Sequence, residues 1–561
     1  MVRARTHFES RTALAPVVFA VSGAALLFAL PNGVGAADSP SRFAVAAQDE
    51  ATARAAIETL EQGGSAVDAA IAGSAMLGVT APVSCGLGGG GFTLVYDASE
   101  KKTFAFDYRE VSPAAYGLET YRSKQQGAPI GVPGEVAGLV ELHRRWGKRS
   151  FADDLAPAAR AAENGFVVSQ HVAEFLGYRS KLFDHTPYGA VFAPRGVLAK
   201  AQERVTNRPL GRTLRHIGAE GAKAFYQGPI AAEIVQVAQG AGSPLALSDF
   251  ASYRVITREP LRKKWEGYEV VTMPPPSGGG ILLLETLGIY SKAELSNMGF
   301  GTAGYIHMLA EAMRGAIADR MRAVGDPAFS PDRSAELLAP ERLKSRRLRI
   351  SAERTHAPQR FELVEPGTTH LVVADAKGNV VALTTTVNGP FGSGVLAAQS
   401  GVVLNDELSD FTDPEIAARF GTSPGPNAPR GGARPVSSMT PTIVFRDGSP
   451  EIVMGGSGGS RIPVNVTQVL LCRLVFGKTP EQCVAAPRFF TPPTGPTLAY
   501  NPEQLPPIAV QVDLLERGEQ IKPPQYEDTT AVQMIAVERA GGEIRMLAAA
   551  DPRKGGVALV R

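Results

Sequence analysis

The chain has 561 residues, of which 44% are hydrophobic and 20% charged, as expected of a globular protein with a large core or two ordinary domains. Its formal net charge is +2, so no basic field favours a nucleic-acid partner. The eight histidines show no metal-ligand spacing and the three cysteines form no CxxC pair, so we expect no metal site.

The cysteines leave two possibilities open. Cys472 and Cys483 either pair in an oxidising compartment or are buried as small hydrophobic residues. Cys85 is expected to be packed rather than reactive.

Residues 1–37 have the organisation of a secretory signal. Three arginines near the start precede an apolar run at 14–30, and small residues at 34–37 offer a cleavage site. The sequence therefore predicts an exported protein, periplasmic or secreted. The alternative is an uncleaved anchor, for which the run is marginal, and no other stretch has the composition of a membrane span.

The next stretch predicts two helices and a glycine-rich turn. Residues 50–62 are rich in Ala and Glu and end at Gly63-Gly64, and Ser65 to Asp68 resembles a capping box that opens a second helix. Residues 86–91 match GxGxxG, but the strand-like run 92–97 follows where dinucleotide binding needs a helix. We therefore expect no cofactor, and glycines that allow close backbone packing.

Further along the chain, a strand is predicted at 103–106 and a helical stretch begins at 131–135. Residues 150–350 alternate amphipathic helices with turns rich in Pro and Gly. Residues 340–366 are charged and contain proline, so we expect an exposed connector.

Thr368 stands at the start of a predicted hairpin. It follows Pro366-Gly367 and opens a β-rich run, residues 375–379 form a turn, and 380–387 form the second strand. Such a Thr is usually part of an ordinary turn. If the chain is cut before it, however, its own α-amino group can act as a base, because that group titrates at about 7.7–8.0.

Several motifs downstream support the catalytic interpretation. They are Thr384-Thr385-Thr386-Val387-Asn388, residues 405–411 (NDELSDF), residues 434–439 (RPVSSM) and residues 455–461 (GGSGGSR). In this order they resemble the small subunit of the gamma-glutamyltransferases, which are N-terminal-nucleophile hydrolases. The resemblance runs from about residue 43 to the C-terminus.

The resemblance implies a fold and a maturation step. It implies an α+β, four-layer αββα sandwich with mostly antiparallel sheets, built from two autoproteolytic fragments. Cleavage between Gly367 and Thr368 would give a large subunit, 38–367, and a catalytic small subunit, 368–561, which remain associated as a heterodimer. The implied substrates are glutathione and other γ-glutamyl compounds, with water, an amino acid or a peptide as acceptor.

The resemblance also implies residue roles. Thr368 would be the nucleophile, Thr386 would orient its amino group, and the N–H groups of Gly458 and Gly459 would form an oxyanion hole. The substrate α-carboxylate would bind Arg109, Ser437 and Ser438, and the α-ammonium would bind Asn388, Glu407 and Asp410. Residues 412–432 would be a lid that lacks the Tyr of some family members, where Phe420 could substitute.

Three other functions remain open. Gly455 to Gly459 also match the GxSxG pattern of serine hydrolases, although no His follows His370. A related acylase of the same fold could cleave glutaryl side chains from β-lactams. An inactive exported protein could retain the γ-glutamyl pocket without being cut.

Overall fold

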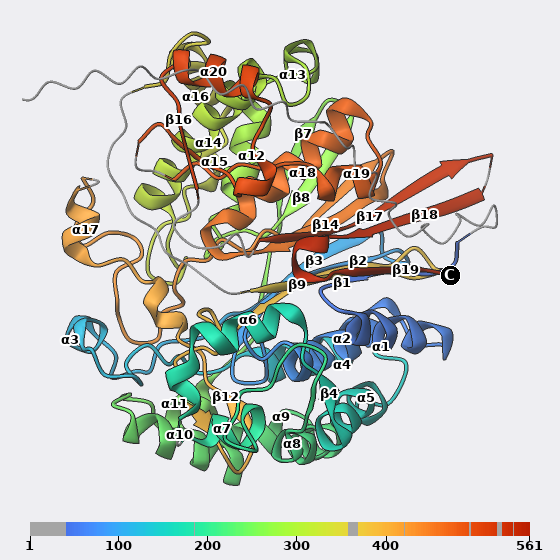
Figure 1. Ribbon diagram of the computed structural model, residues 1–561, viewed down its shortest axis with the longest axis vertical. Coiled ribbons are helices and arrows are strands. Elements are labelled where there is room, and N and C mark those ends of the chain that lie inside the picture. Colours follow the sequence, from blue (N-terminus) through green and yellow to red (C-terminus); the bar gives the residue numbers. More distant parts are fainter. Residues whose placement is uncertain are drawn as a thin grey trace, which may run out of the picture. The chain divides into compact units, whose positions relative to one another are not determined.

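Two antiparallel β-sheets lie face to face, each covered on its outer side by helices (Figure 1). The computed structural model describes residues 41–184, 186–356, 368–419, 421–492, 495–523, 530–541 and 543–561. The predicted signal, Gly367 and Phe420 lie outside these ranges.

The first sheet has seven strands in the order β19-β1-β9-β10-β2-β3-β6, and every neighbouring pair is antiparallel. At its centre, β9 and β10 form the predicted hairpin, in which Thr369 is paired with Thr385. The strands of this sheet are β1 (Ala44–Ala47), β2 (Gly90–Asp97), β3 (Lys102–Tyr108), β6 (Ile256–Arg258), β9 (Thr369–Ala374), β10 (Val380–Thr386) and β19 (Val557–Val560).

The second sheet has six strands in the order β18-β17-β14-β13-β8-β7, again antiparallel throughout. Its central strand β14 packs against β9 and β10 of the first sheet. The strands are β7 (Leu261–Trp265), β8 (Tyr268–Thr272), β13 (Thr442–Arg446), β14 (Ser449–Ser457), β17 (Ala531–Ala540) and β18 (Glu543–Ala550).

Alternation along the central strands produces two hydrophobic cores. On β9, Leu371 and Val373 join the core beneath the helices of the first sheet, whereas Val372 and Ala374 join the core that includes the second sheet. The helices that pack on the first sheet are α1 (Glu50–Glu61), α2 (Ala66–Thr80) and α4 (Glu135–Trp146). On the second sheet lie α12 (Gly279–Ile289) and α18 (Ile462–Phe476), with α14 (Ala303–Ala323) packed on α12. The architecture is therefore the αββα sandwich that was predicted.

Further helices extend the two outer layers. Those before residue 260 are α3 (Leu118–Arg122), α5 (Phe151–Asn164), α6 (Gln170–Tyr178), α7 (Pro187–Phe192), α8 (Arg208–Glu220), α9 (Ala222–Tyr226), α10 (Pro229–Gly240) and α11 (Leu247–Ser252). Those after it are α13 (Lys292–Met298), α15 (Ser334–Leu337), α16 (Pro340–Arg349), α17 (Pro414–Arg419), α19 (Pro480–Ala485) and α20 (Ile508–Glu516).

Both sheets combine strands from before and after residue 368. In the first sheet, β9 and β10 lie between β1 and β2, and in the second sheet β13 pairs with β8. A chain cut before Thr368 would therefore leave two fragments that share both sheets and cores.

Local predictions held at the N-terminal end of the fold. Helix α1 matches the predicted span to within one residue. Helix α2 opens with the predicted capping box, in which Ser65 accepts from the Asp68 N–H and the Asp68 carboxylate accepts from the Ser65 N–H. The expectation for 150–350 was incomplete, because residues 256–272 form β6, β7 and β8.

The expectation of an exposed connector at 340–366 was wrong for its first part. Residues Pro340–Arg349 form α16, and Arg346 bonds Glu285 at 2.5 Å and Asp319 at 3.1 Å. Arg342 also reaches Glu285, at 3.2 Å. The charged residues of this segment therefore belong to a helix whose arginines neutralise the fully buried Glu285 carboxylate. Composition alone did not reveal this role.

The structure decides between the two possibilities for the cysteines. Cys472 and Cys483 form a disulfide that joins α18 to α19, and Cys85 is buried and free.

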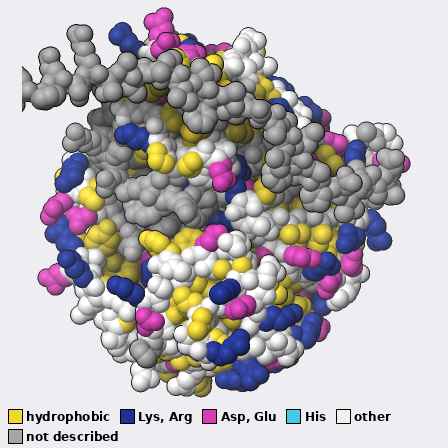
Figure 2. Space-filling model, in the orientation of Figure 1, with side chains coloured by type: hydrophobic (Ala, Val, Ile, Leu, Met, Phe, Trp, Pro, Cys, Tyr) yellow, Lys and Arg dark blue, Asp and Glu magenta, His cyan; other side chains and the backbone are white. Residues whose placement is uncertain are grey.

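None of the helices in the described ranges is both long and apolar enough to cross a bilayer. On the face shown in Figure 2, Lys and Arg are interspersed with Asp and Glu among the side chains that are coloured.

The Arg346 pair generates a stability prediction. Arg346→Met leaves buried Glu285 with weaker neutralisation, so we expect the thermal midpoint to fall by roughly 2–4 °C. Arg349→Met, on an exposed position of the same helix, is the control and should change it little. Equal midpoints for the two variants in differential scanning fluorimetry would contradict this assignment.

Candidate active site

Thr368 is buried one position before the first paired residue of β9. It is 4% exposed, and its Oγ1 lies 3.4 Å from Oγ1 of Thr386, the last residue of β10. The neighbouring strand β2 brings Gly89 so close to the Thr386 carbonyl that a Cβ at this position would overlap it. The glycine-rich turn therefore serves close packing beside Thr386, as the sequence analysis expected.

Asn388 extends the contacts away from Thr386. Its backbone N–H donates to Thr386 Oγ1 at 2.8 Å, and its side-chain Nδ2 donates to Asp410 Oδ1 at 3.2 Å and to the Asp406 carbonyl at 3.3 Å. Its φ of 69° is left-handed, a conformation that Asn tolerates better than most residues. The tight bend after β10 thus places Asn388 so that its backbone contacts Thr386 and its side chain contacts Asp410.

Arg109 lies at the far end of these contacts, where it binds Asp410. It follows β3 and is 1% exposed, and its Nη2 donates to Asp410 Oδ2 at 2.8 Å while Nη1 pairs with Glu407. Glu407 and Asp410 belong to one 3-10 turn, Glu407–Asp410. Five of the predicted site residues besides Thr368 therefore join one network, namely Thr386, Asn388, Glu407, Asp410 and Arg109.

The carboxylates around Arg109 outnumber its charge. Glu110 Oε2 lies 3.8 Å from Arg109 Nη1, and neither Glu110 oxygen nor Oε2 of Glu407 has a hydrogen-bond partner among the described residues. Burial raises the pKa of Glu110 to about 8 and raises that of Glu407 well above its usual value, despite the opposing effect of Arg109. Burial opposes the Arg109 charge, but the three surrounding carboxylates raise the Arg109 pKa overall.

The glycine pair occupies the turn between β14 and α18. Gly458 has φ 117° and Gly459 has φ 60°, both left-handed, and a Cβ on Gly458 would lie 2.9 Å from Thr530 Cα. Three residues earlier, Gly455 lies directly against the ring of His370, which is two residues after Thr368. The turn therefore belongs to the part of β14 that packs against the start of β9.

The serine-hydrolase alternative finds little support here. Ser457 Oγ is buried without a hydrogen-bond partner in the described part of the chain, and His370 Nδ1 lies 2.8 Å from Thr384 Oγ1. Burial lowers the pKa of His370 to about 3. A Ser–His pair is thus not assembled at the GxSxG match.

Ser437 and Ser438 lie in a buried segment beside this network. Ser437 forms hydrogen bonds with Met439, Pro276 and Gly278 that shape the segment itself. The same segment reaches the Arg109 strand through Arg434, whose Nη1 lies 3.0 Å from Asp107 Oδ2, while Asp107 Oδ1 accepts from the Arg109 N–H at 3.0 Å. Asp107 and Arg434 therefore hold the two segments together, a role the sequence did not reveal.

The expected lid segment begins directly after the site. Asn427 donates to the Asp410 carbonyl at 2.7 Å and its own carbonyl accepts from the Thr412 N–H at 2.8 Å. Between them, Arg122 binds Asp413 at 2.8 Å and Glu415 at 2.9 Å, ahead of and within α17. This loop is therefore joined to Asp410 through Asn427, and to the end of α3 through Arg122.

Two buried acids beside the site were missed by sequence analysis. Glu110 was interpreted only as a neighbour of Arg109, and Glu135 only as part of a helix start. Glu135 accepts from Ser74 at 2.5 Å and from Thr385 at 2.8 Å, and burial raises its pKa to about 7. Their burial could not be predicted without knowing that α4 brings Glu135 to Thr385 of β10, and that the end of β3 is enclosed with Arg109.

Glu110 generates a pH prediction. Its pKa is about 8 in the folded protein against 4.5 as an isolated side chain, so the unfolded chain loses this proton first as pH rises. The contribution to stability is complete below about pH 4.5 and is lost as pH rises towards 8. Glu110→Gln should therefore flatten the fall of the thermal midpoint between pH 5 and 8, whereas exposed Glu58→Gln should not. Parallel curves for wild type and Glu110→Gln would contradict the assignment.

Comparisons with known proteins identify the family of this chain. The family model described as gamma-glutamyltranspeptidase matches residues 52–560. The glutathione hydrolase proenzyme of Pseudomonas aeruginosa is 38% identical over 84% of this chain and 87% of its own length. Glutathione hydrolase 2 of Arabidopsis thaliana is 34% identical over 91% of this chain and 93% of its own length.

A solved structure shares this fold. The cephalosporin acylase from Bacillus halodurans superposes with a TM-score of 0.82 at 27% sequence identity, covering 93% of this chain and 96% of the acylase. Family model and relatives both extend over most of the chain. This protein therefore belongs to the gamma-glutamyltranspeptidase family of enzymes.

Proposed function

We propose that this chain is a self-cleaving γ-glutamyltransferase and glutathione hydrolase whose nucleophile is Thr368. The observation that carries the proposal is the continuous series of contacts from Thr368 through Thr386 and Asn388 to Asp410 and Arg109. It places a buried hydroxyl at one end and a site with charges of both signs at the other.

Maturation is the first reaction. The Thr368 hydroxyl attacks the Gly367 carbonyl carbon, the acyl group moves from nitrogen to oxygen, and water hydrolyses the resulting ester. The products are a new carboxylate on Gly367 and a free amine on Thr368. Since strands from both fragments share each sheet, fragments 38–367 and 368–561 remain associated as a heterodimer.

Turnover then uses the same hydroxyl. The Thr368 amine removes the hydroxyl proton as the oxygen attacks the γ-carbonyl carbon, and it returns the proton to the leaving amine. Thr386 orients the Thr368 amine, and the N–H groups of Gly458 and Gly459 stabilise the oxyanion, for which one donor is worth roughly 3 kcal/mol. Water or an acceptor amine then releases the γ-glutamyl group.

The charges around Arg109 match the head group of a γ-glutamyl compound. Its α-carboxylate binds Arg109, with Ser437 and Ser438 beside it, and its α-ammonium binds Asn388, Glu407 and Asp410. Oε2 of Glu407 has no hydrogen-bond partner in the described ranges, so it is available as an acceptor for that ammonium. A buried acceptor without a donor costs about 1–3 kcal/mol, which ammonium binding would relieve.

Export follows from the predicted signal at 1–37. A structural disulfide such as Cys472–Cys483 persists in oxidising compartments, so it supports a periplasmic or secreted location.

A cephalosporin or glutaryl acylase is the second candidate, because a cephalosporin acylase is a structural neighbour over nearly the whole chain. A glutaryl group has no α-ammonium, so it offers nothing to Glu407 and Asp410. Two carboxylates held against one arginine therefore favour γ-glutamyl over glutaryl substrates.

The first functional prediction concerns maturation. Wild type should give two bands on a denaturing gel, with N-terminal sequencing of the smaller starting at Thr368. Thr368→Ala should remain one chain without γ-glutamyl-p-nitroanilide hydrolysis, because both reactions use its hydroxyl. A Thr368→Ala protein that is still cut and active would refute the proposal, and an uncut but folded wild type would favour a binding protein.

The second functional prediction separates the two substrates. Asp410→Asn weakens a charge-assisted contact to the ammonium, so KM for γ-glutamyl-p-nitroanilide should rise roughly tenfold to a hundredfold. Hydrolysis of glutaryl-p-nitroanilide should not weaken in the same way. Asp447→Asn, at an exposed turn, is the control and should match wild type. Faster wild-type turnover of the glutaryl compound would favour the acylase.

A further inference from the structure

Lys554 places a buried ammonium beside the residue proposed as nucleophile. It is 4% exposed, and its Nζ donates to the Thr368 carbonyl oxygen at 3.3 Å. Lysine is rarely buried without a specific partner, because removing its charge from water is costly. The contact joins the C-terminal end of the chain to the start of β9, two segments 186 positions apart.

A fixed turn holds Lys554 in this position. Lys554 ends the 3-10 helix Pro552–Lys554, which Asp551 caps by accepting from the Arg553 N–H at 3.1 Å. Asp551 is fully buried and also accepts from Arg488 at 2.6 Å and from the Val532 N–H at 3.1 Å. The turn is thereby fastened to β17 and to the segment after α19.

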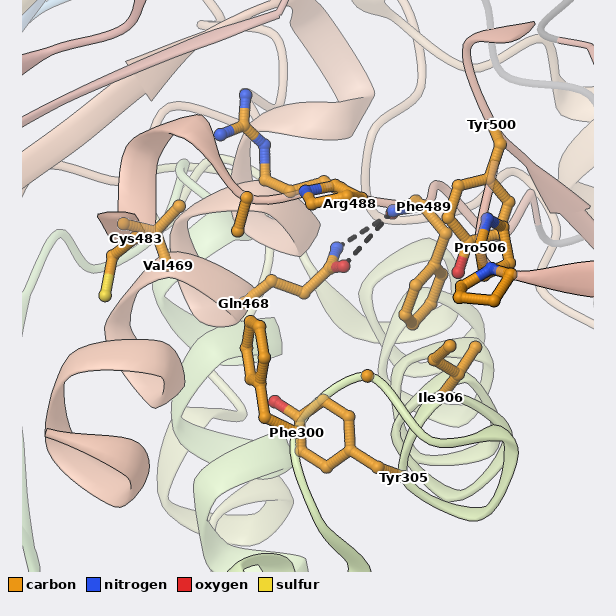
Figure 3. Close-up of a pocket in the computed structure, with 14 residues that line it drawn as sticks. Phe300, Tyr305, Ile306, Gln468, Val469, Cys483, Arg488, Phe489, Tyr500 and Pro506 are labelled. Carbon is orange, nitrogen blue, oxygen red and sulfur yellow. Dashed lines mark hydrogen bonds between the residues drawn. The ribbon is translucent and has the colours of Figure 1, made fainter. Parts of the chain in front are cut away.

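Arg488 lies between the turn that holds Lys554 and a neighbouring pocket. Figure 3 shows the pocket lined by aromatic side chains such as Phe300 and Phe489, where Gln468 bonds the Phe489 backbone. The Arg488 side chain points away from the Phe300 and Tyr305 side of this pocket, and its guanidinium binds Asp551. Arg488 therefore supports the Lys554 turn rather than the interior of the pocket.

The position of Thr368 explains why such a support matters. Thr368 lies one place before the paired register of β9, which starts at Thr369. Cleavage would remove its covalent restraint on the N-terminal side, so contacts such as those of its side chain and its carbonyl would contribute more to its position. The amine shares its Cα with the carbonyl carbon, and the hydroxyl is carried on the Cβ bonded to that Cα, so holding the carbonyl restricts the positions open to both groups. Small misplacements of reacting groups reduce rates by large factors.

We propose that Lys554 is a positioning residue for Thr368, holding the Thr368 carbonyl so that hydroxyl and amine face the γ-carbonyl of the substrate. The inference rests on the proposed function, since it requires Thr368 to be the nucleophile. Lys554 acts through Thr368 rather than through the substrate head group bound near Arg109. Its loss should therefore reduce kcat and leave KM nearly unchanged.

The test compares Lys554→Met, which keeps the apolar stem without the ammonium, with Lys554→Arg, which keeps a donor. Each full-length protein is allowed to mature, and kcat and KM for γ-glutamyl-p-nitroanilide are normalised to the amount of N-terminal Thr368. We expect kcat of Lys554→Met to fall at least tenfold with KM within threefold of wild type, and Lys554→Arg to recover a substantial part of kcat. Exposed Lys223→Met is the control and should behave as wild type.

Several outcomes would overturn the inference. They are a Lys554→Met kcat within threefold of wild type, a rise in KM as large as the fall in kcat, or equal losses in Lys554→Met and Lys554→Arg. If Lys554→Met folds but stays uncut while Lys554→Arg is cut, the inference is supported, because cleavage uses the same hydroxyl. Thr368→Ala measured in parallel separates the claims: activity in Thr368→Ala refutes the proposed function, whereas an inactive Thr368→Ala beside a fully active Lys554→Met refutes only the role of Lys554.

Discussion

The buried guanidinium of Arg109 is the interaction on which the site depends. It holds Glu407 and Asp410 of one turn, and Asp410 in turn holds Asn388, whose backbone contacts Thr386 beside Thr368. Charges this far from water require partners, so the arginine and its carboxylates fix one another's positions. The geometry near Thr368 therefore depends on an ion pair assembled by residues some 300 positions apart in sequence.

The sandwich makes that long-range assembly rigid. Arg109 follows β3 of the first sheet, Thr368 and Thr386 flank the β9–β10 hairpin of the same sheet, and Gly458 follows β14 of the second. Because β14 packs against β9 and β10, the end of one sheet approaches the end of the other. The same interleaving would keep the fragments together after a cut, without any added interface.

Much of this arrangement could be predicted from sequence, and the exceptions have physical reasons. The hairpin after Thr368 and the capping box at Ser65 were predictable because turn and cap signals are local. Helix α16 was not, because its arginines pair with Asp319 and with Glu285, and the sequence does not display the burial of Glu285. Glu110 and Lys554 were missed for the same reason. The burial of each depends on packing against segments that lie far away in the sequence.

The central claim is that a single residue, freed at its backbone nitrogen, forms the covalent link to the substrate. The most direct test is mass spectrometry of the enzyme denatured during turnover of a γ-glutamyl compound, with fragment mapping of the modified residue. The account predicts a small fragment that begins at Thr368 and carries one γ-glutamyl group on its Thr368 oxygen. A γ-glutamyl group on any other residue, or turnover by a chain that is never cut, would contradict it.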